Sequence, residues 1–302
     1  MRKKNFLFLC IPALFFRNTF VRLHSARLNI FPYLCGQIVE KMTEKHFCLD
    51  DSPEFRWLEL DEVSSTNDYL KNYRPLQEQR MTLVTAEHQT AGRGAGSNAW
   101  ESRPGENLLF SLLTHPRHID SGKVFLLSEA LALAVREALG GEGFAVKWPN
   151  DIYYGERKVC GMLIENDLRG KVVDRCIMGV GVNVNQTEFA FDRTQHDGLR
   201  LMAEPVSLAQ IVGHPVERRF VLERVVEHFD RYYRWTEEGR TEELHQRYID
   251  HLYRRGEEHR FVDKDGCFRG TIVDVEPTGH LIITDAEGQR RRYAFKEVAF
   301  SA

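Results

Sequence analysis

Apolar and polar residues alternate in blocks along this chain, and from Phe55 onward the spacing predicts strands and helices in mixed order. Short apolar, β-branched runs bounded by turn-forming residues are typical of buried strands. This pattern predicts strands over residues 55–63, 81–87, 107–114, 144–148, 159–165 and 172–184.

Apolar positions that recur every three or four residues predict the helices. Residues 64–67 supply capping side chains for a first short helix. Asp120 or Ser121 is predicted to cap a second helix, which ends at the glycine pair 140–141. Residues 216–253 are amphipathic and predict a long third helix.

After Gly256 the pattern changes to short strands separated by turns at 265–266, 277–279 and 286–288. The chain therefore predicts an α+β domain over residues 42–255, followed by a small β-barrel over residues 256–302. The arginine run 290–292 is interpreted as a solvated strand edge, since charge commonly protects sheet edges.

Residues 1–41 differ in composition from the rest of the chain. Basic residues 2–4 precede an apolar run over 6–16, as in a secretory signal, but further arginines follow and no clear cleavage site is present. The run is also shorter than the roughly twenty residues of a membrane span. We expect a disordered extension or a mis-assigned start before Met42, with a working signal as the alternative; no membrane partner is predicted.

Charge and cysteine usage narrow the function classes. A net charge of −3 provides no basic surplus for nucleic acid. Cys160 and Cys176 lie within apolar runs, and no C-x-x-C pair occurs in the sequence, which favours free thiols and a cytoplasmic location. The histidine spacing does not indicate a structural zinc site.

The most concentrated chemistry lies between Gly92 and Trp100, where three glycines surround Arg93. Glycines allow backbone N–H groups to converge on an anion, and the arginine adds a fixed charge. A phosphate or carboxylate site is one interpretation of this stretch, and a surface turn is the other. The stretch is neither a Walker P-loop nor a Rossmann fingerprint.

Two further segments shift the balance toward a binding site. The sequence K-W-P-N-D ends at Asp151 and is followed by Lys158, which begins an apolar strand and therefore needs an anionic partner. Glycines 179 and 181 interrupt a strand that runs up to Asn183, and strand glycines often mark close approach by a ligand or backbone.

Taken together, six ordered motifs resemble the catalytic domain of biotin–protein ligases, also called biotin–[acetyl-CoA-carboxylase] ligases. The motifs are S-T-N, A-E-H-Q-T-A-G-R-G, W-E-S, K-W-P-N-D, R-K-V-C-G-M-L-I-E and G-V-G-V-N-V-N. The resemblance is dense from Phe55 to Asn185, and the F-K-E-V-A-F ending fits the family's SH3-like domain. It implies a mixed-sheet catalytic domain like that of class II aminoacyl-tRNA synthetases and biotin ligases.

The resemblance implies an ATP-dependent ligase that forms biotinyl-5'-AMP and transfers biotin to a lysine of a biotin carboxyl carrier domain. A free carboxylate is a poor acyl donor, which explains the need for ATP, with Mg²⁺, before the amine attacks. In the resemblance Lys158 and Arg93 are the catalytic residues. The implied biotin- and adenylate-binding residues are Ser65, Thr66, Asn67, Gln89, Gly92, Arg93, Gly94, Ala95, Trp100, Asn150, Asp151, Lys158, Gly161 and Asn183.

Some of these assignments keep an alternative. Simple helix capping explains Ser65 equally well, a core position explains Trp100, and a strand-terminating turn explains Asn183. Asp151 and Asn150 are assigned to the ATP and Mg²⁺ end, with no metal site built from protein side chains alone. Ala95 is a departure, because some relatives carry a second arginine there.

Three functions remain in competition at this point. Biotin ligation is favoured over lipoate or octanoate ligation, because those relatives usually carry an R-R-x-S-G-G-G stretch that this chain lacks. A non-catalytic biotin-responsive regulator is disfavoured, because sensing needs no ATP site. The segment before Phe55 does not read as a helix-turn-helix, so the form without a DNA-binding domain is expected, and a homodimer stays open.

Overall fold

The computed structural model describes residues 54–74, 77–96, 98–190, 196–197, 200–201 and 203–300. The predicted extension over residues 1–41 lies outside the described residues, as do Cys10, Cys35 and Cys48. Within the described part, every helix is too short or too polar to serve as a membrane-spanning segment.

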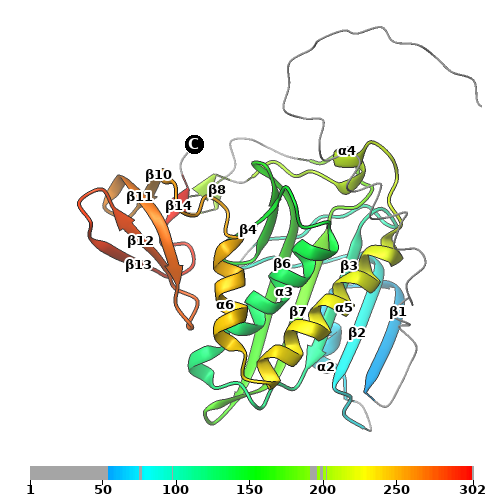
Figure 1. Cartoon of the computed structure of the whole chain (residues 1–302). Helices are drawn as coiled ribbons and strands as arrows, with labels where there is room; N and C mark the ends of the chain where they lie inside the picture. Colours follow the sequence, from blue (N-terminus) through cyan, green and yellow to red (C-terminus); the bar gives the residue numbers. More distant parts are fainter. Residues whose placement is uncertain are drawn as a thin grey trace, which may run out of the picture.

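A seven-stranded mixed sheet forms the larger part of the molecule (Figure 1), in the order β1-β2-β3-β7-β6-β5-β4. Only the β1–β2 pair is parallel among these neighbouring strands, which confirms the mixed-sheet α+β prediction. The strands are β1 (Phe55–Val63), β2 (Met81–Gln89), β3 (Leu108–Thr114), β4 (Phe144–Lys147), β5 (Asp151–Tyr154), β6 (Arg157–Arg169) and β7 (Val172–Val182).

Three helices cover one face of this sheet in Figure 1: α3 (Phe125–Ala138), α5 (Arg218–Glu237) and α6 (Thr241–Asp250). The prediction of a single helix over 216–253 is wrong, because Gly239, at φ 76°, ends one helix and lets the chain start the next. Asp120 caps a short 3₁₀ turn, η2 (Ser121–Lys123), and α3 itself has no side-chain cap. A further short helix, α4 (Leu208–Val212), was not predicted.

The two sheet faces bury separate apolar clusters because strand side chains alternate in direction. Phe110 and Met178 belong to the large cluster under the helices, whereas Leu113 and Ile177 pack on Leu70 of α2 (Thr66–Asn72). Since α2 is short, it covers only part of the second face. The uncovered part of that face is where the functional side chains gather.

The C-terminal residues form a separate five-stranded antiparallel sheet, in the order β13-β12-β11-β10-β14. Its strands are β10 (Glu258–Asp263), β11 (Gly266–Val275), β12 (Leu281–Asp285), β13 (Arg290–Tyr293) and β14 (Ala299–Phe300). Its turns use the predicted glycines at positive φ, and β13 lies at an edge as predicted. This sheet corresponds to the expected SH3-like domain.

Specific contacts join this small sheet to the main domain beside β4 and α6 (Figure 1). Trp148 Nε1 donates to the carbonyl of Gly279 over 2.9 Å. The ammonium of Lys147 lies 3.4 Å from the ring centroid of Phe300, a cation–π contact. The C-terminal sheet therefore touches the K-W-P-N-D segment directly. The two-residue strands β8 (His196–Asp197) and β9 (Arg200–Leu201) form a small separate pair.

Candidate active site

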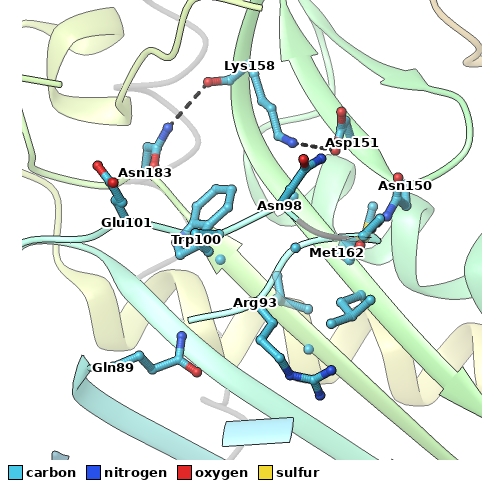
Figure 2. Close-up of a pocket in the computed structure, with 18 of the residues that line it drawn as sticks. Gln89, Arg93, Asn98, Trp100, Glu101, Asn150, Asp151, Lys158, Met162 and Asn183 are labelled. Carbon is cyan, nitrogen blue, oxygen red and sulfur yellow. Dashed lines mark hydrogen bonds and ion pairs between the residues drawn. The ribbon is translucent and has the colours of Figure 1, made fainter. Parts of the chain in front are cut away.

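A cavity of about 610 Å³ lies on the part of the sheet that α2 leaves open (Figure 2). Its lining draws on segments from both ends of the described chain. Of the site residues predicted from sequence, those that line it are Ser65, Thr66, Asn67, Gln89, Arg93, Gly94, Ala95, Trp100, Asn150, Asp151, Lys158, Gly161 and Asn183. A volume of this size suits a small organic ligand with a polar extension.

Strand glycines make the floor of the cavity flat. Gly161 of β6 pairs with Gly181 of β7, and Gly179 lies two residues away on the same face. A Cβ on Gly181 would overlap the ring of Trp100, and one on Gly179 would overlap the amide of Asn67. The sequence-based expectation that these glycines mark a close approach is confirmed.

One end of the cavity is a network of uncharged polar side chains around the start of α2, next to the ion pair of Arg93 and Glu165. Ser65 caps the helix, its side chain accepting from the Asp68 amide. The amide and hydroxyl of Thr66 donate to Gln89 Oε1 over 2.8 and 3.1 Å. Ser111 Oγ donates to Asn67 Oδ1 over 2.6 Å. Ser65 therefore caps the helix and also lines the cavity, while Thr66 and Asn67 are held as directional donors and acceptors.

The other end carries an ion pair between Lys158 and Asp151, with 2.7 Å between Nζ and Oδ1. Asp151 is almost fully buried and Lys158 is partly exposed toward the cavity. The anionic partner that was predicted for Lys158 is therefore present, and it is Asp151. In Figure 2 this pair and Gln89 lie on opposite sides of Trp100.

Arg93 makes contacts that the sequence did not predict. Its guanidinium pairs with Asp68 over 2.7 Å and with Glu165 over 3.0 Å. Burial raises the pKa of the Glu165 carboxyl, but hydrogen bonds from Lys71, Asn67 and Arg93 outweigh this and hold that pKa below its usual value. The glycine-rich loop is therefore tied by charge to α2 and β6.

Trp100 forms one wall of the cavity. The indole lies over Gly161 and Gly181, and its ring centroid is 5.7 Å from the Lys158 ammonium. Its Nε1 is buried with no hydrogen-bond partner among the described residues. A core tryptophan normally satisfies this N–H, so the wall position is favoured over a simple packing role.

Asn150 and Asn183 combine cavity lining with local structure. The Asn150 amide donates to the carbonyl of Met162, and the Asn183 amide lies 3.4 Å from the carbonyl of Lys158.

Gly92, by contrast, does not line the cavity. Its carbonyl accepts from the Trp100 amide over 2.9 Å, and a Cβ there would overlap the Trp100 carbonyl. A direct ligand role for Gly92 stays a prediction.

Other lining residues were not predicted as site residues: Asn98, Ala99, Glu101, Met162, Leu163, Gly179, Val180, Gly181, Gln186, Phe189, Ala190, Ala203, Pro205 and Phe295. The strand glycines among them had a sequence signal, since they interrupt an apolar run. Phe295 had none, because it reaches the cavity from the C-terminal sheet.

Comparison with known proteins places this geometry in a family. Residues 60–183 match the Biotin/lipoate A/B protein ligase family. The bifunctional ligase/repressor BirA of Bacillus spizizenii is 31% identical over 238 residues, which cover 78% of this chain and 71% of that protein. The Bacillus subtilis BirA is 31% identical over 217 residues, covering 70% of this chain and 64% of its own length.

Solved structures agree with these matches. The Aquifex aeolicus biotin protein ligase in complex with biotin and ATP superimposes with a TM-score of 0.66 and 29% identity, covering 82% of this chain and 99% of that one. The Leishmania major biotin protein ligase with biotinyl-5-AMP gives a TM-score of 0.53 and 25% identity, covering 81% and 100%. On its motifs, fold and relatives, this chain belongs to the biotin protein ligase family.

Proposed function

We propose that this protein is an ATP-dependent biotin–protein ligase. The observation that carries the proposal is that one cavity joins a neutral polar end, around Thr66 and Gln89, to a charged end at Lys158 and Asp151. Biotin has the same division, with a neutral ureido ring at one end and a carboxylate at the other. The structures of the related biotin protein ligases with biotin and ATP, and with biotinyl-5-AMP, support the same ligands for this chain.

In the first step a biotin carboxylate oxygen attacks the α-phosphorus of ATP, giving biotinyl-5'-AMP and pyrophosphate. Ser65, Thr66, Asn67 and Gln89 hold the ureido ring through directional hydrogen bonds on the flat glycine floor. Lys158 then neutralises charge that develops as the phosphorus gains a fifth oxygen, an electrostatic role. Asp151 fixes the ammonium where this charge arises.

In the second step a lysine amine of the acceptor attacks the acyl carbon, forming an amide and releasing AMP. The loop of Arg93, Gly94 and Ala95 and the wall at Trp100 shield the mixed anhydride from water. The acceptor is proposed to be the biotin carboxyl carrier domain of a carboxylase. A Paracoccus denitrificans relative named biotin–[acetyl-CoA-carboxylase] ligase, 35% identical over 106 residues, supports this choice; it covers 33% of this chain and 43% of that protein.

Mg²⁺ is proposed to arrive on the phosphates of ATP. The described residues include no cluster of three or more His, Cys, Asp or Glu side chains suited to a metal. Asp151 and Asn150 border the charged end and are the proposed contacts for the Mg²⁺–ATP unit. The free thiols of Cys160 and Cys176, both buried, are compatible with the proposed cytoplasmic location.

The direct test incubates the protein with ATP, Mg²⁺, a carrier domain and either biotin or lipoate, and detects the modified carrier by mass spectrometry. Biotin addition that requires ATP is the expected result. Transfer of lipoate alone would replace the proposal with lipoate ligation. Tight biotin binding without any transfer or ATP–pyrophosphate exchange would identify a sensor instead.

A further inference from the structure

The glycine-rich loop ends at Trp100, and the chain that follows is bound to the segment just beyond β7. The Arg103 amide donates to Gln186 Oε1 over 3.1 Å. Asn107 Nδ2 donates to the same oxygen over 2.7 Å and to Ser102 Oγ over 3.0 Å. The Gln186 carboxamide oxygen therefore accepts two hydrogen bonds from the chain between Trp100 and β3.

This network is buried. Gln186 is 6% exposed and Asn107 is fully buried. Asn107 Oδ1 accepts from the Val184 amide over 3.0 Å, and the Asn185 amide donates to the Glu106 carbonyl over 2.9 Å. A buried donor that loses its acceptor costs more free energy than an exposed one. The network therefore holds the chain after Trp100 firmly against the end of β7.

Gln186 lines the cavity, but its polar atoms are engaged within the protein. Its Oε1 accepts the two hydrogen bonds described above, and its Nε2 donates to the Glu188 carbonyl over 2.8 Å. A side chain that binds a ligand directly keeps a polar atom available for it. These contacts favour a positioning role for Gln186 over direct contact with substrate.

The position of Trp100 depends on what holds its neighbours in the chain. Its indole Nε1 is buried with no hydrogen-bond partner among the described residues, so no bond of its own orients the ring. The backbone is fixed on the loop side by the 2.9 Å bond from the Trp100 amide to the Gly92 carbonyl. On the other side it is fixed by the Gln186 network. The ring lies directly over Gly161 and Gly181, where a small displacement changes the space above the cavity floor.

The two ends of the loop are held by different kinds of contact. The Arg93 side chain is 36% exposed and forms ion pairs with Asp68 and Glu165. Exposed ion pairs contribute little to stability, whereas hydrogen bonds among buried amides are costly to break. The Trp100 end is therefore the preorganised end, and preorganisation reduces the cost of ligand binding.

We propose that Gln186 is a positioning residue of the ligase site that acts through Trp100. It places the indole over the glycine floor before biotin binds, so that the acyl chain of biotin enters a slot of fixed width. The inference rests on the proposed ligase function, and it assigns no ligand contact to Gln186 itself.

The test variant is Gln186→Met, which keeps the length of the side chain and removes the acceptor. Calorimetry without nucleotide should show the Kd for biotin rising about tenfold, the equivalent of one lost buried hydrogen bond. In a Trp100→Ala background the same substitution should leave the Kd unchanged, because no indole remains to be positioned. Ser102→Ala removes a second bond of the same network, with less risk to folding, and should shift the Kd in the same direction.

Gln210→Met is the matched control. Gln210 Oε1 accepts from the Ser207 amide and its Nε2 donates to the Thr187 carbonyl, but its side chain does not line the cavity. The control should keep the wild-type Kd for biotin. Amide hydrogen exchange over residues 100–103, measured without ligand, should be faster in Gln186→Met than in wild type or in Gln210→Met.

An unchanged Kd in Gln186→Met, or a rise that persists in the Trp100→Ala background, would overturn the proposal, and the same criteria apply to Ser102→Ala. Unchanged hydrogen exchange over residues 100–103 in Gln186→Met would overturn it as well. ATP–pyrophosphate exchange by the wild-type protein tests the ligase function separately. If the protein binds biotin but shows no such exchange, the ligase function fails, while the biotin titrations still decide the role of Gln186.

Discussion

Lys158 and Asp151 lie on adjacent strands, and their 2.7 Å contact depends on an irregularity in the strand pairing. Asp151 pairs with Gly161 and Ile152 with Cys160, but Tyr153 then pairs with Lys158, so β6 contains one extra residue. In a regular ladder Lys158 would face the opposite side of the sheet from Asp151. The β-bulge turns its side chain into the cavity, as bulges commonly do beside active sites.

Replacing Lys158 with alanine should therefore abolish adenylate formation while the fold survives. The ammonium is the cation nearest to the reacting phosphate in the proposed mechanism, and removing one such group costs about 100-fold or more in rate. Biotin-dependent ATP–pyrophosphate exchange measures this step, and circular dichroism checks the fold. Lys171→Ala, in the exposed turn between β6 and β7, is the control expected to keep full activity. If Lys158→Ala retained ATP–pyrophosphate exchange, the catalytic role of Lys158 would be contradicted.

Much of the cavity was predictable because its chemistry lies in residues that break a local pattern. Lys158 interrupts an apolar strand, and Gly179 and Gly181 leave gaps in another. Each of these residues needs a contact from another part of the chain. The fold supplies Asp151 for Lys158, and it places Asn67 and Trp100 over the two glycines. The α+β domain and the later β-barrel followed from apolar periodicity and turn glycines, and the mixed sheet followed from the family resemblance.

The features that escaped prediction depend on long-range geometry. Strand β5 has only four residues and directly follows the Pro149 turn, and it was not predicted as a strand. The bulge at Lys158 is a property of strand pairing, which a single strand sequence does not encode. Glu165 meets Arg93 only because β6 passes under the loop. Gly239 was overlooked because the apolar pattern continues across the break between α5 and α6.

A second prediction concerns Gly179, whose missing side chain leaves room for the Asn67 amide. Gly179→Ala should displace Asn67 from Ser111 and weaken biotin binding about tenfold, the equivalent of one lost hydrogen bond. Calorimetric titration with biotin measures the change. Gly122→Ala is the matched control, because its nearest neighbour would be Asp120 Oδ1 at 3.3 Å, outside the cavity. Equal biotin affinity in both variants would contradict the placement of the ureido end.

A third prediction links the glycine-rich loop to pH through Glu165. The pKa of Glu165 is lower in the folded state than in the unfolded chain. Its ion pair with Arg93 therefore stabilises the loop fully at pH values above the unfolded pKa, and this stabilisation is lost as the pH falls through the folded pKa. In Glu165→Gln the charge that attracts Arg93 is missing at every pH, as it is in wild type only at low pH. Hydrogen exchange in residues 92–96 should therefore be faster than in wild type near pH 7, and this difference should shrink below about pH 4.

Glu59→Gln, on the exposed side of edge strand β1, controls for the loss of a surface carboxylate and should leave loop exchange unchanged. If hydrogen exchange in residues 92–96 at pH 7 were the same in Glu165→Gln and wild type, the Glu165 carboxylate would not be the group that anchors the loop. The salt bridge from Arg93 to Asp68 would then be sufficient.

The last prediction concerns His245 of α6, which joins the two domains. Its Nδ1 lies 2.8 Å from buried Glu129 on α3, and its Nε2 lies 3.1 Å from Asp274 on β11. The hydrogen bond to Glu129 raises the pKa of His245, against the opposing effect of burial. Burial in turn raises the pKa of Glu129, which His245 partly offsets. The buried Tyr248 hydroxyl beside them has a raised pKa for the same reason.

Because the pKa of His245 is raised on folding, its stabilising contribution is complete below the unfolded value near 6.5 and disappears as pH rises through the folded value. Between pH 6 and pH 8.5 the free energy of unfolding should fall by about 1–2 kcal/mol, the worth of a charge-assisted hydrogen bond. His245→Asn should remove most of this slope, whereas His214→Asn, an exposed substitution, should keep it. Guanidinium titrations at the two pH values measure the difference, and equal slopes in the two variants would show that the domain contact does not depend on the His245 charge.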